Sequence, residues 1–252
     1  MSLELNRSPE EARDYLSRAL RNPDVADDRI RDHVRLASGP QPYAHSYYSS
    51  DRFFAADSAA GVIRNVYGQR MLRVTGNFFR SLHRAIAQVS GERSDQVLFH
   101  IGYRWGQEAI KSFVPRLEQE FECEFEKLNM AVMLESWWWP SRASGWGVWR
   151  CDFGHAREGL VLVDLSSSPT AEALGRGPHT ICSLEAGLFA ALFGHLAHRE
   201  LGCVELECSA RGSDRCRFLV ATPGRVETAT RRRDEGAGVD EIVRHLASMA
   251  MV

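Results

Sequence analysis

Four of the six cysteines in this sequence fall between Cys182 and Cys216, and their spacing suits metal binding. Cys208 and Cys216 flank a segment rich in turn-forming residues, so a hairpin would bring their sulfurs together. Glu205 lies three residues before Cys208, and a bend or bulge in the strand would turn its carboxylate toward the same point. Cys182 stands at the start of a predicted helix, whose N-terminus favours a thiolate. Three thiolates and one carboxylate suit Zn²⁺.

Such a zinc shell would be closed. A tetrahedral site with four protein ligands leaves no position for water, which is typical of structural zinc and argues against metal-dependent hydrolysis. The spacing is less specific than a pair of CxxC motifs. Residue chemistry alone therefore leaves two alternatives open, namely buried free thiols and a disulfide between Cys208 and Cys216.

Hydrophobic spacing predicts the elements that position these residues. Gly102 and Gly106 lie one turn apart in one predicted helix, and two glycines in a helix indicate close approach of another backbone. No alternation of strands and helices typical of a parallel sheet is found, so an α+β fold is expected, with an antiparallel sheet packed with helices. We predict helices over 77–91, 94–115, 178–194 and 239–249, a meander over 129–139, 145–153 and 159–165, and a hairpin of 203–208 with 215–221.

Composition and charge limit the partners. The chain has 252 residues, 44% hydrophobic and 25% charged, as is ordinary for globular proteins. A formal net charge of -2, from 31 basic and 33 acidic residues, gives no field that would hold a polyanion, so no direct contact with nucleic acid is expected. The sequence has neither an apolar run of membrane-spanning length nor a signal peptide, so we expect a cytoplasmic protein with no membrane contact.

Three regions are predicted along the chain. Residues 1–60 read as an arm with a helix from Ser8 to Arg21, and the aromatic residues of this arm would pack on their own domain or on a second subunit, as a dimer contact. Residues 61–226 form the predicted ligand-binding domain. Residues 227–252 read as a polar, solvated linker around Arg231–Arg233, followed by an amphipathic helix.

The stretch ELECSARGSDRCRF, from Glu205 to Phe218, resembles the signature of the 4-vinyl reductase domain family. In that family, glutamate, cysteine, glycine, cysteine and phenylalanine recur in this order. Cys182, followed by Gly187 and Gly194, falls where the family has an earlier cysteine at a helix. In sensor members these four positions bind a structural zinc. The resemblance thus implies Zn²⁺ at Cys182, Glu205, Cys208 and Cys216, and a C-terminal hairpin stapled by zinc.

The helical half of the chain resembles the sensor domain of phenol-responsive and xylene-responsive transcription activators. The resemblance rests on Gly61, Gly68 and Arg70–Leu72, with Gly102 and Gly106, and extends over roughly residues 60–226. Those activators carry an ATPase module and a DNA-binding helix-turn-helix after the sensor, and this chain ends before them. A free-standing sensor or carrier is therefore expected.

Aromatic residues dominate the predicted pocket. Phenol sensors of this family use a histidine and a tryptophan beside the zinc, and alignment through Gly145 places Phe125 and Phe153 there. Neither can pair with a phenol hydroxyl, so a more apolar ligand is expected. In a strand, Trp137 and Trp139 would point to one side and Trp138 to the other. The pocket is predicted to include Phe125, Trp137, Trp149, Phe153 and Trp105.

Taken together, these features predict a non-enzymatic module with structural Zn²⁺ that binds a small hydrophobic or aromatic ligand and signals to a protein partner, as a homodimer. An enzyme accessory in tetrapyrrole metabolism is one alternative, but no Gly-x-Gly-x-x-Gly motif or flavin or iron–sulfur spacing supplies a hydride or electron donor, and no catalytic residue is predicted. A structural adaptor, resembling subunits of membrane-tethering complexes with this fold, is the other.

Overall fold

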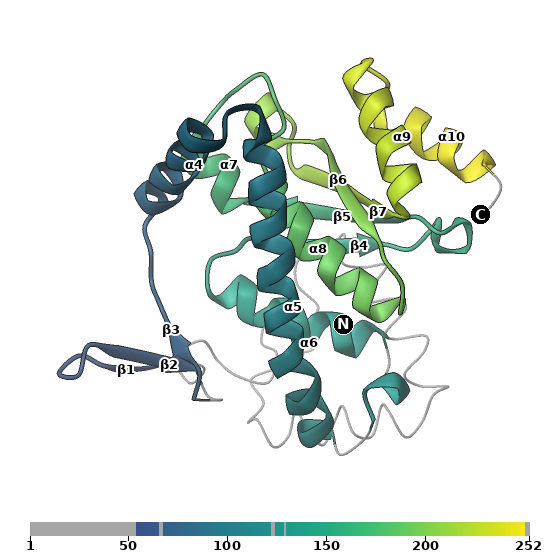
Figure 1. Ribbon diagram of the computed structural model, residues 1–252. Helices are drawn as coiled ribbons and strands as arrows, with labels where there is room; N and C mark the ends of the chain where they lie inside the picture. The colour runs from purple at the N-terminus through teal and green to yellow at the C-terminus, as the bar shows by residue number, and fades with distance from the viewer. Residues whose placement is uncertain (1–53, 66–67, 122–123, 129, 250–252) are drawn as a thin grey trace, which may run out of the picture. The chain divides into compact units, whose positions relative to one another are not determined.

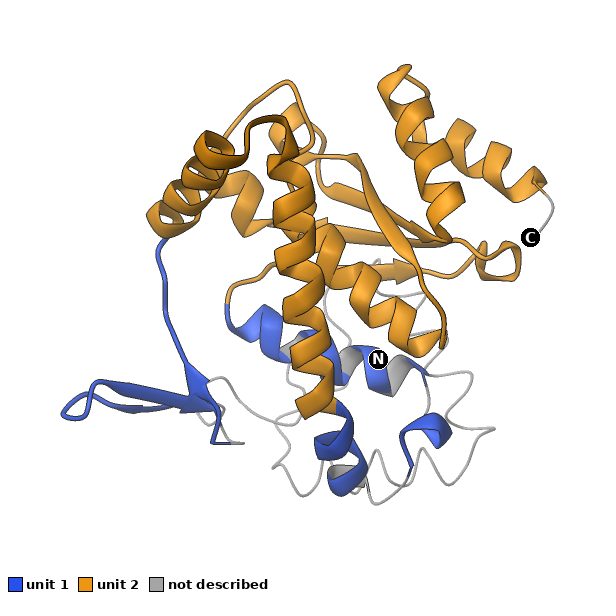
Figure 2. Cartoon of the chain, viewed as in Figure 1, with its two compact units in different colours: residues 1–75, 114–144 blue, residues 76–113, 145–252 orange. Residues whose placement is uncertain are grey.

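The computed structural model describes residues 54–65, 68–121, 124–128 and 130–249, and these form the α+β fold expected from the sequence (Figure 1). The chain divides into two compact units (Figure 2): unit 1 comprises residues 1–75 and 114–144, and unit 2 comprises residues 76–113 and 145–252. The helix predicted from Ser8 to Arg21 lies outside the described residues. So does most of the predicted arm.

Unit 1 contains a small antiparallel sheet and two helical segments. Its strands are β1 (Phe54–Asp57), β2 (Val62–Asn65) and β3 (Arg70–Met71), in that order. Gly61, at a positive φ of 63°, allows the tight turn between β1 and β2. The unit also holds the last residues of α5, the short helix η3 (Phe125–Lys127) and helix α6 (Met130–Ala143).

Helix α6 replaces a strand expected over residues 129–139, so that prediction is wrong. A continuous apolar run does not distinguish a buried strand from a buried helix by periodicity alone. In the structure Met133 and Trp137, four residues apart, are both buried, as is Leu134 beside them, which is the spacing of one helical face. The expected alternation of the consecutive tryptophans across a strand therefore does not occur.

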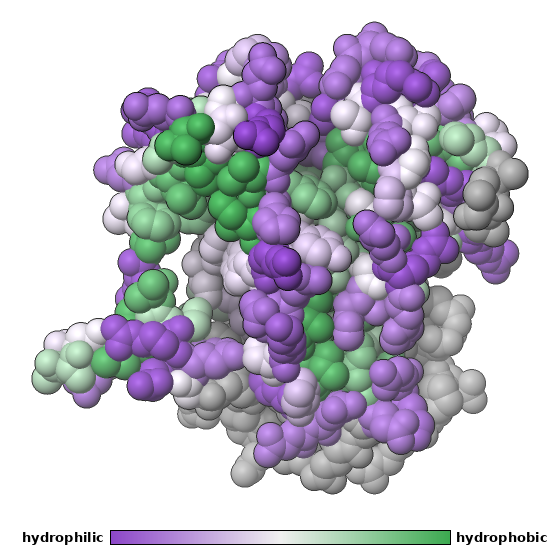
Figure 3. All heavy atoms as spheres, in the orientation of Figure 1, coloured by the Kyte–Doolittle hydropathy of each residue, from purple (hydrophilic) through white to green (hydrophobic). Residues whose placement is uncertain are grey.

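Unit 2 begins with two long helices where they were predicted. Helix α4 (Gly76–Ser90) is followed by η2 (Gly91–Arg93) and α5 (Ser94–Phe121), which continues past Pro115 instead of ending near it. Phe79 is buried, but large apolar side chains elsewhere on α4 and α5 are exposed, and Figure 3 shows apolar surface gathered around these helices. The exposed residues are Phe78, Val89, Ile101 and Trp105.

The main sheet of unit 2 is antiparallel and has the strand order β4-β5-β7-β6. Its register pairs Val163 with Phe218 and Glu205 with Phe218, and it shifts between Glu205 and Glu207, where a bulge interrupts the ladder. All four strands were predicted. They are β4 (Val148–Asp152), β5 (Val161–Ser166), β6 (Gly202–Glu207) and β7 (Cys216–Ala221), with η4 (Ala156–Glu158) and η5 (Ser209–Arg211) in the connections.

Helix α8 (Ser183–Leu196) packs against β6 and β7 and against α5. A Cβ atom on Gly102 of α5 would lie 1.8 Å from the carbonyl oxygen of Leu184, and one on Gly187 of α8 would lie 2.0 Å from that of Phe99. The close approach predicted from the glycines is thus confirmed. Because α8 is enclosed, it is apolar around nearly its whole circumference. The ring of Phe189 contacts those of Trp149 and Phe218.

One short helix, α7 (Pro169–Leu174), was not predicted. Ser168 is its N-cap, accepting a hydrogen bond from the backbone N–H of Ala171 at 3.2 Å, and Pro169 occupies the first helical position. This Ser-Pro start is a recognised helix signal. The helix contacts α4, and Arg80 of α4 donates to the carbonyl oxygen of Ala173 at 2.8 Å.

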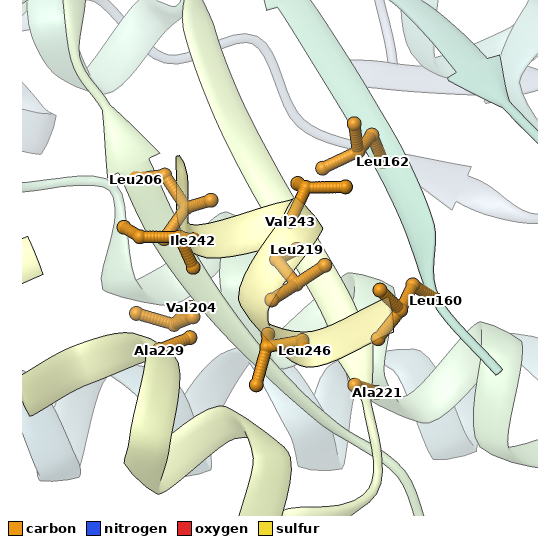
Figure 4. Packing of buried hydrophobic residues seen from close by; sticks show 10 residues of the cluster. All are labelled: Leu160, Leu162, Val204, Leu206, Leu219, Ala221, Ala229, Ile242, Val243 and Leu246. Carbon is orange, nitrogen blue, oxygen red and sulfur yellow. The ribbon is translucent and has the colours of Figure 1, made fainter. Parts of the chain in front are cut away.

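The C-terminal segment is a pair of helices instead of a linker followed by one helix. Helix α9 (Pro223–Asp234) includes the three arginines that were expected to be solvated, and α10 (Val239–Ser248) was predicted. Gly236, at a φ of 89°, provides the turn between them. Their apolar faces close a core with the sheet (Figure 4) formed by Leu160, Leu162, Val204, Leu206, Leu219, Ala221, Ala229, Ile242, Val243 and Leu246. None of the helices in the described part of the chain has the length and apolar character needed to span a membrane.

Candidate metal site

The structure brings together the four residues that the sequence analysis selected as metal ligands. Cys182 is the N-cap residue of α8, Glu205 lies in β6, Cys208 follows β6 and Cys216 begins β7. One ligand atom from each lies within 4.8 Å of all the others, and all four side chains are buried. This buried cluster beside the C-terminal hairpin could hold a metal ion.

Local backbone features aim the side chains of the hairpin at one point. Val204 and Leu206 face the core under α9 and α10, so Glu205 between them points to the opposite side of the sheet, toward Cys182. The bulge that begins at Glu205 supplies the bend that the sequence analysis required. Beyond it, η5 and the turn at Gly212 reverse the chain. Gly212 adopts a φ of 103°, which a residue with a side chain rarely adopts.

The sulfur atoms are spaced as metal ligands would be. The Cys182 and Cys216 sulfurs are 3.6 Å apart, and those of Cys208 and Cys216 are 3.9 Å apart. Zinc–sulfur bonds of about 2.3 Å in a tetrahedron require sulfur pairs about 3.8 Å apart. A disulfide would instead hold two sulfurs at about 2.0 Å, and the cysteines of this cluster are free thiols in the structure. The disulfide alternative is therefore not what the fold contains.

Glu205 offers one oxygen to the protein and one to the cluster. Its Oε2 accepts hydrogen bonds from the backbone N–H groups of Ile181 and Cys182, at 3.0 and 2.9 Å. Its Oε1 is buried and has no hydrogen-bond partner. A buried carboxylate oxygen without a donor is costly to leave unmatched, and a cation would satisfy it. The donor set and this unmatched oxygen both fit a thiophilic divalent ion such as Zn²⁺.

The protein groups alone leave the cluster short of compensating charge. Burial and the nearby Cys216 raise the pKa of Glu205 to about 8. Hydrogen bonds from Cys182 and Cys208 lower the pKa of Cys216 to about 2, whereas hydrogen bonding with these neighbours and burial raise the pKa of Cys182 far above its ordinary value. One thiolate is thus stabilised by protons on its neighbours. A divalent cation would replace those protons, so metal binding should release them.

Two serines form a second layer around the sulfurs. The hydroxyl of Ser168, the N-cap of α7, lies 3.4 Å from the Cys182 sulfur, so α7 is attached directly to the cluster. Ser209 places both its backbone N–H and its hydroxyl 3.4 Å from the Cys216 sulfur. Such outer contacts orient the ligands of metal sites.

Sequence analysis missed a second buried acid close to the cluster. Glu185 lies in the first turn of α8, is fully buried, and accepts a hydrogen bond from the hydroxyl of Thr170 at 2.5 Å. Its Oε2 has no hydrogen-bond partner, and burial raises its pKa to about 7. The available signal was a single acidic residue in an otherwise apolar helix, Ser183–Leu196.

The residues predicted to line the ligand pocket are divided between the two units. Phe125 and Trp137 are buried in unit 1. Trp149, Phe153 and Trp105 belong to unit 2, where they contact the rings of Phe189, Phe193 and Trp146 at centroid distances of 4.9, 6.4 and 4.6 Å. A surface groove along α9 is lined by residues between Val226 and Glu235, and none of the five lies in it. The shared pocket stays a prediction.

Comparison with known proteins gives matches at the level of domain and fold. Residues 162–222 match the 4-vinyl reductase domain, and this range contains all four cluster residues. Among solved structures, the phenol-responsive sensory domain of the transcription activator PoxR, crystallised with phenol, is similar over 72% of this chain and 90% of that chain, with 17% identity and a TM-score of 0.55. This likeness shows the fold.

A second solved structure gives a weaker likeness. A vinyl-4-reductase family protein from Methanocaldococcus jannaschii aligns over 60% of this chain and 82% of that chain, with 19% identity and a TM-score of 0.41. The comparison with curated proteins gave no match.

Proposed function

We propose, from a chain that carries a 4-vinyl reductase domain over residues 162–222, that this protein is a non-enzymatic sensor or carrier. It holds one structural Zn²⁺, binds a small hydrophobic or aromatic molecule, and passes the state of that site to a protein partner. The observation that carries the proposal is the buried cluster of three cysteines and one glutamate, whose ligand atoms lie within 4.8 Å of one another.

Zinc in this cluster would act as a staple. Cys182 belongs to the start of α8, whereas Glu205, Cys208 and Cys216 belong to the hairpin of β6 and β7. One ion would therefore bind a helix that packs on the sheet to two strands of that sheet. With four protein ligands, the shell has no position for a reacting water, which supports a structural role over a catalytic one.

The proposed ligand class rests on the fold and on the side chains available. The sensory domain of PoxR, which shares this fold, is phenol-responsive. In this chain the positions expected beside the ligand are Phe125 and Phe153, which carry no hydrogen-bonding side-chain group. A buried phenol hydroxyl without a partner costs about 1 to 3 kcal/mol. We therefore propose an apolar aromatic ligand, such as a methylated benzene, over phenol itself.

The exposed apolar residues of α4 and α5 support a protein contact. Phe78 and Val89 of α4 are 52% and 87% exposed, and Ile101 and Trp105 of α5 are also exposed. Large apolar side chains gathered on one surface are typical of an interaction site. A second copy of this chain is the proposed occupant, which makes the sensor a homodimer.

Native mass spectrometry of the purified protein, repeated after denaturation, tests this proposal in one comparison. The proposed function predicts one zinc per chain and a dimeric mass in the native spectrum, with any co-purified aromatic molecule released on denaturation. A Cys208→Ala protein should lose the zinc. A native wild-type protein with no metal and free thiols would overturn the zinc-containing sensor. A dimer with zinc that binds none of a panel of aromatic hydrocarbons would favour the adaptor alternative.

A further inference from the structure

Helices α9 and α10 lie beyond the match to the 4-vinyl reductase domain, which ends at residue 222, yet they are part of the core of unit 2. Figure 4 shows Ile242, Val243 and Leu246 of α10 packed over Leu219 of β7. Ala229 contributes the α9 side of the same cluster. The pair of helices thus covers the face of the sheet opposite to the face that carries the metal cluster.

Two arginines of α9 hold the pair together. Arg225 is buried and donates to the carbonyl oxygens of Glu158 and, at 2.9 Å, Met249, so it joins α9 to the end of α10 and to η4. Arg232 pairs with Glu241 of α10 at 2.5 Å. The two helices therefore form one docked body.

A third arginine of α9 reaches the metal cluster. Arg233 Nη1 donates to the backbone carbonyl oxygen of Glu205 at 2.9 Å and contacts the hydroxyl of Thr180 at 3.3 Å. The rest of its guanidinium donates to Asp234 at 2.8 and 2.9 Å, which balances its charge. The Arg233 side chain is only 18% exposed. It was expected to be solvated, and the structure contradicts that expectation.

The two groups that Arg233 contacts belong to the two segments that carry the ligands. Glu205 supplies the carboxylate, and Thr180 lies two residues before Cys182. The same two segments are joined on the other side of the strand by the hydrogen bonds from Ile181 and Cys182 to the Glu205 carboxylate. Arg233 therefore holds the Glu205 backbone at the bulge, where the regular strand ladder is interrupted.

We propose that Arg233 is a positioning residue of the metal site, and that through it the docking of α9 and α10 is coupled to metal binding. This inference rests on the proposed zinc site. Coupling between two sites is reciprocal, so if docked helices tighten zinc binding, bound zinc must strengthen docking by the same factor. A helical pair outside the matched domain would then report whether the cluster is loaded.

Zinc affinity of the full chain, measured by competition with a chromophoric chelator, tests the first half of the coupling. Loss of an outer-layer contact typically weakens metal binding 10- to 100-fold. Arg233 contacts the backbone of a ligand and not the ligating atom, so we expect about tenfold weaker binding for Arg233→Gln, near the lower end of that range. Arg233→Lys keeps a donor and should recover part of the loss.

Arg231→Gln is the matched control, because Arg231 is an exposed arginine two residues away on the same helix. Its zinc affinity should equal that of the wild type. If Arg233→Gln binds zinc as tightly as Arg231→Gln and the wild type, the coupling is overturned.

Hydrogen exchange of the wild-type protein with and without Zn²⁺ tests the other half and needs no variant. Bound zinc should slow exchange of the amides in the last turn of α9 and in α10, outside the ligand segments themselves. Equal exchange in those helices in both states would overturn the coupling. A wild-type protein that binds no zinc at all would instead remove the proposed metal site, and that result is distinct from a zinc-binding protein in which Arg233 has no effect.

Discussion

The metal cluster and the predicted aromatic pocket differ in how closely the fold gathers their residues. The ligand atoms of Cys182, Glu205, Cys208 and Cys216 lie within 4.8 Å of one another, all inside unit 2. The five aromatic residues are shared between both units, and those of unit 2 each contact a ring of their own unit.

This difference separates two kinds of evidence for function. Buried polar groups are costly unless they are matched, so four converging ligand atoms with an unmatched Glu205 oxygen point to one specific occupant. Aromatic side chains need no such partner, because burial alone stabilises them. The metal cluster therefore carries the stronger functional argument, and the experiments below test that contrast in order of expected effect.

Removing a thiolate from the cluster should have the largest effect. Cys208→Ala is expected to abolish zinc binding and to lower the free energy of unfolding by at least about 4 kcal/mol, since loss of a structural metal is among the most destabilising changes. Metal analysis and urea denaturation would measure both.

Cys203→Ala is the control, because Cys203 lies in the same strand and is equally buried but is not part of the cluster. Burial raises the pKa of its thiol well above the ordinary value, so it stays neutral. This variant should retain zinc. Equal losses of stability and metal in the two variants would contradict the special role of the cluster.

The buried acid Glu185 should make stability depend on pH. Its folded-state pKa of about 7 lies above the ordinary value of 4.5, so its stabilising contribution is full below pH 4.5 and is lost as the pH rises through 7. The loss is on the order of 3 kcal/mol, at about 1.4 kcal/mol per pKa unit. Urea denaturation of wild type and Glu185→Gln at several pH values measures it.

The difference in unfolding free energy between these two proteins should change by that amount between pH 5 and 8, with Glu185→Gln gaining relative stability at the higher pH. Gln keeps an oxygen that can accept from Thr170. A difference that stays constant with pH would show that Glu185 is ionised throughout.

Ligand preference tests the aromatic region directly. Toluene should bind more tightly than phenol by about 5- to 150-fold, which corresponds to the 1 to 3 kcal/mol cost of an unpaired buried hydroxyl. Isothermal titration with both compounds would measure the ratio. Tighter binding of phenol would mean that a hydroxyl partner exists near Phe125 or Phe153, and the apolar pocket would be wrong.

The smallest expected effect is that of the outer layer. Ser168→Ala removes both the cap of α7 and the contact with the Cys182 sulfur. Loss of an N-cap costs about 1 kcal/mol, measurable by urea denaturation. If the contact with sulfur also matters, zinc affinity should fall, whereas Ser209 still supports the other sulfur. An unchanged affinity would confine Ser168 to its capping role.

The parts of this protein that local chemistry determines could be predicted from its sequence. The hairpin of β6 and β7 and the residues Glu205, Cys208 and Cys216 lie within a few residues of one another, so turn signals and strand alternation place them. Cys182 was placed by its position at a helix start and by the family resemblance. The bulge at Glu205 was anticipated because the carboxylate needed it.

Other features depended on tertiary packing and were missed. The apolar run of α6 fits a strand as well as a helix, and only burial on one helical face distinguishes them. Arg231–Arg233 looked solvated because three adjacent charges usually are, yet docking of α9 places Arg233 on the Glu205 backbone. No local pattern encodes that contact.

X-ray absorption at the zinc K-edge of the purified full chain tests the central claim most directly, because it counts the atoms bound to the metal. The cluster of Cys182, Glu205, Cys208 and Cys216 predicts three sulfur atoms at about 2.3 Å and one oxygen at about 2.0 to 2.2 Å. A shell of nitrogen and oxygen only, or a shell of four sulfurs, would contradict the assignment of this cluster as the metal site.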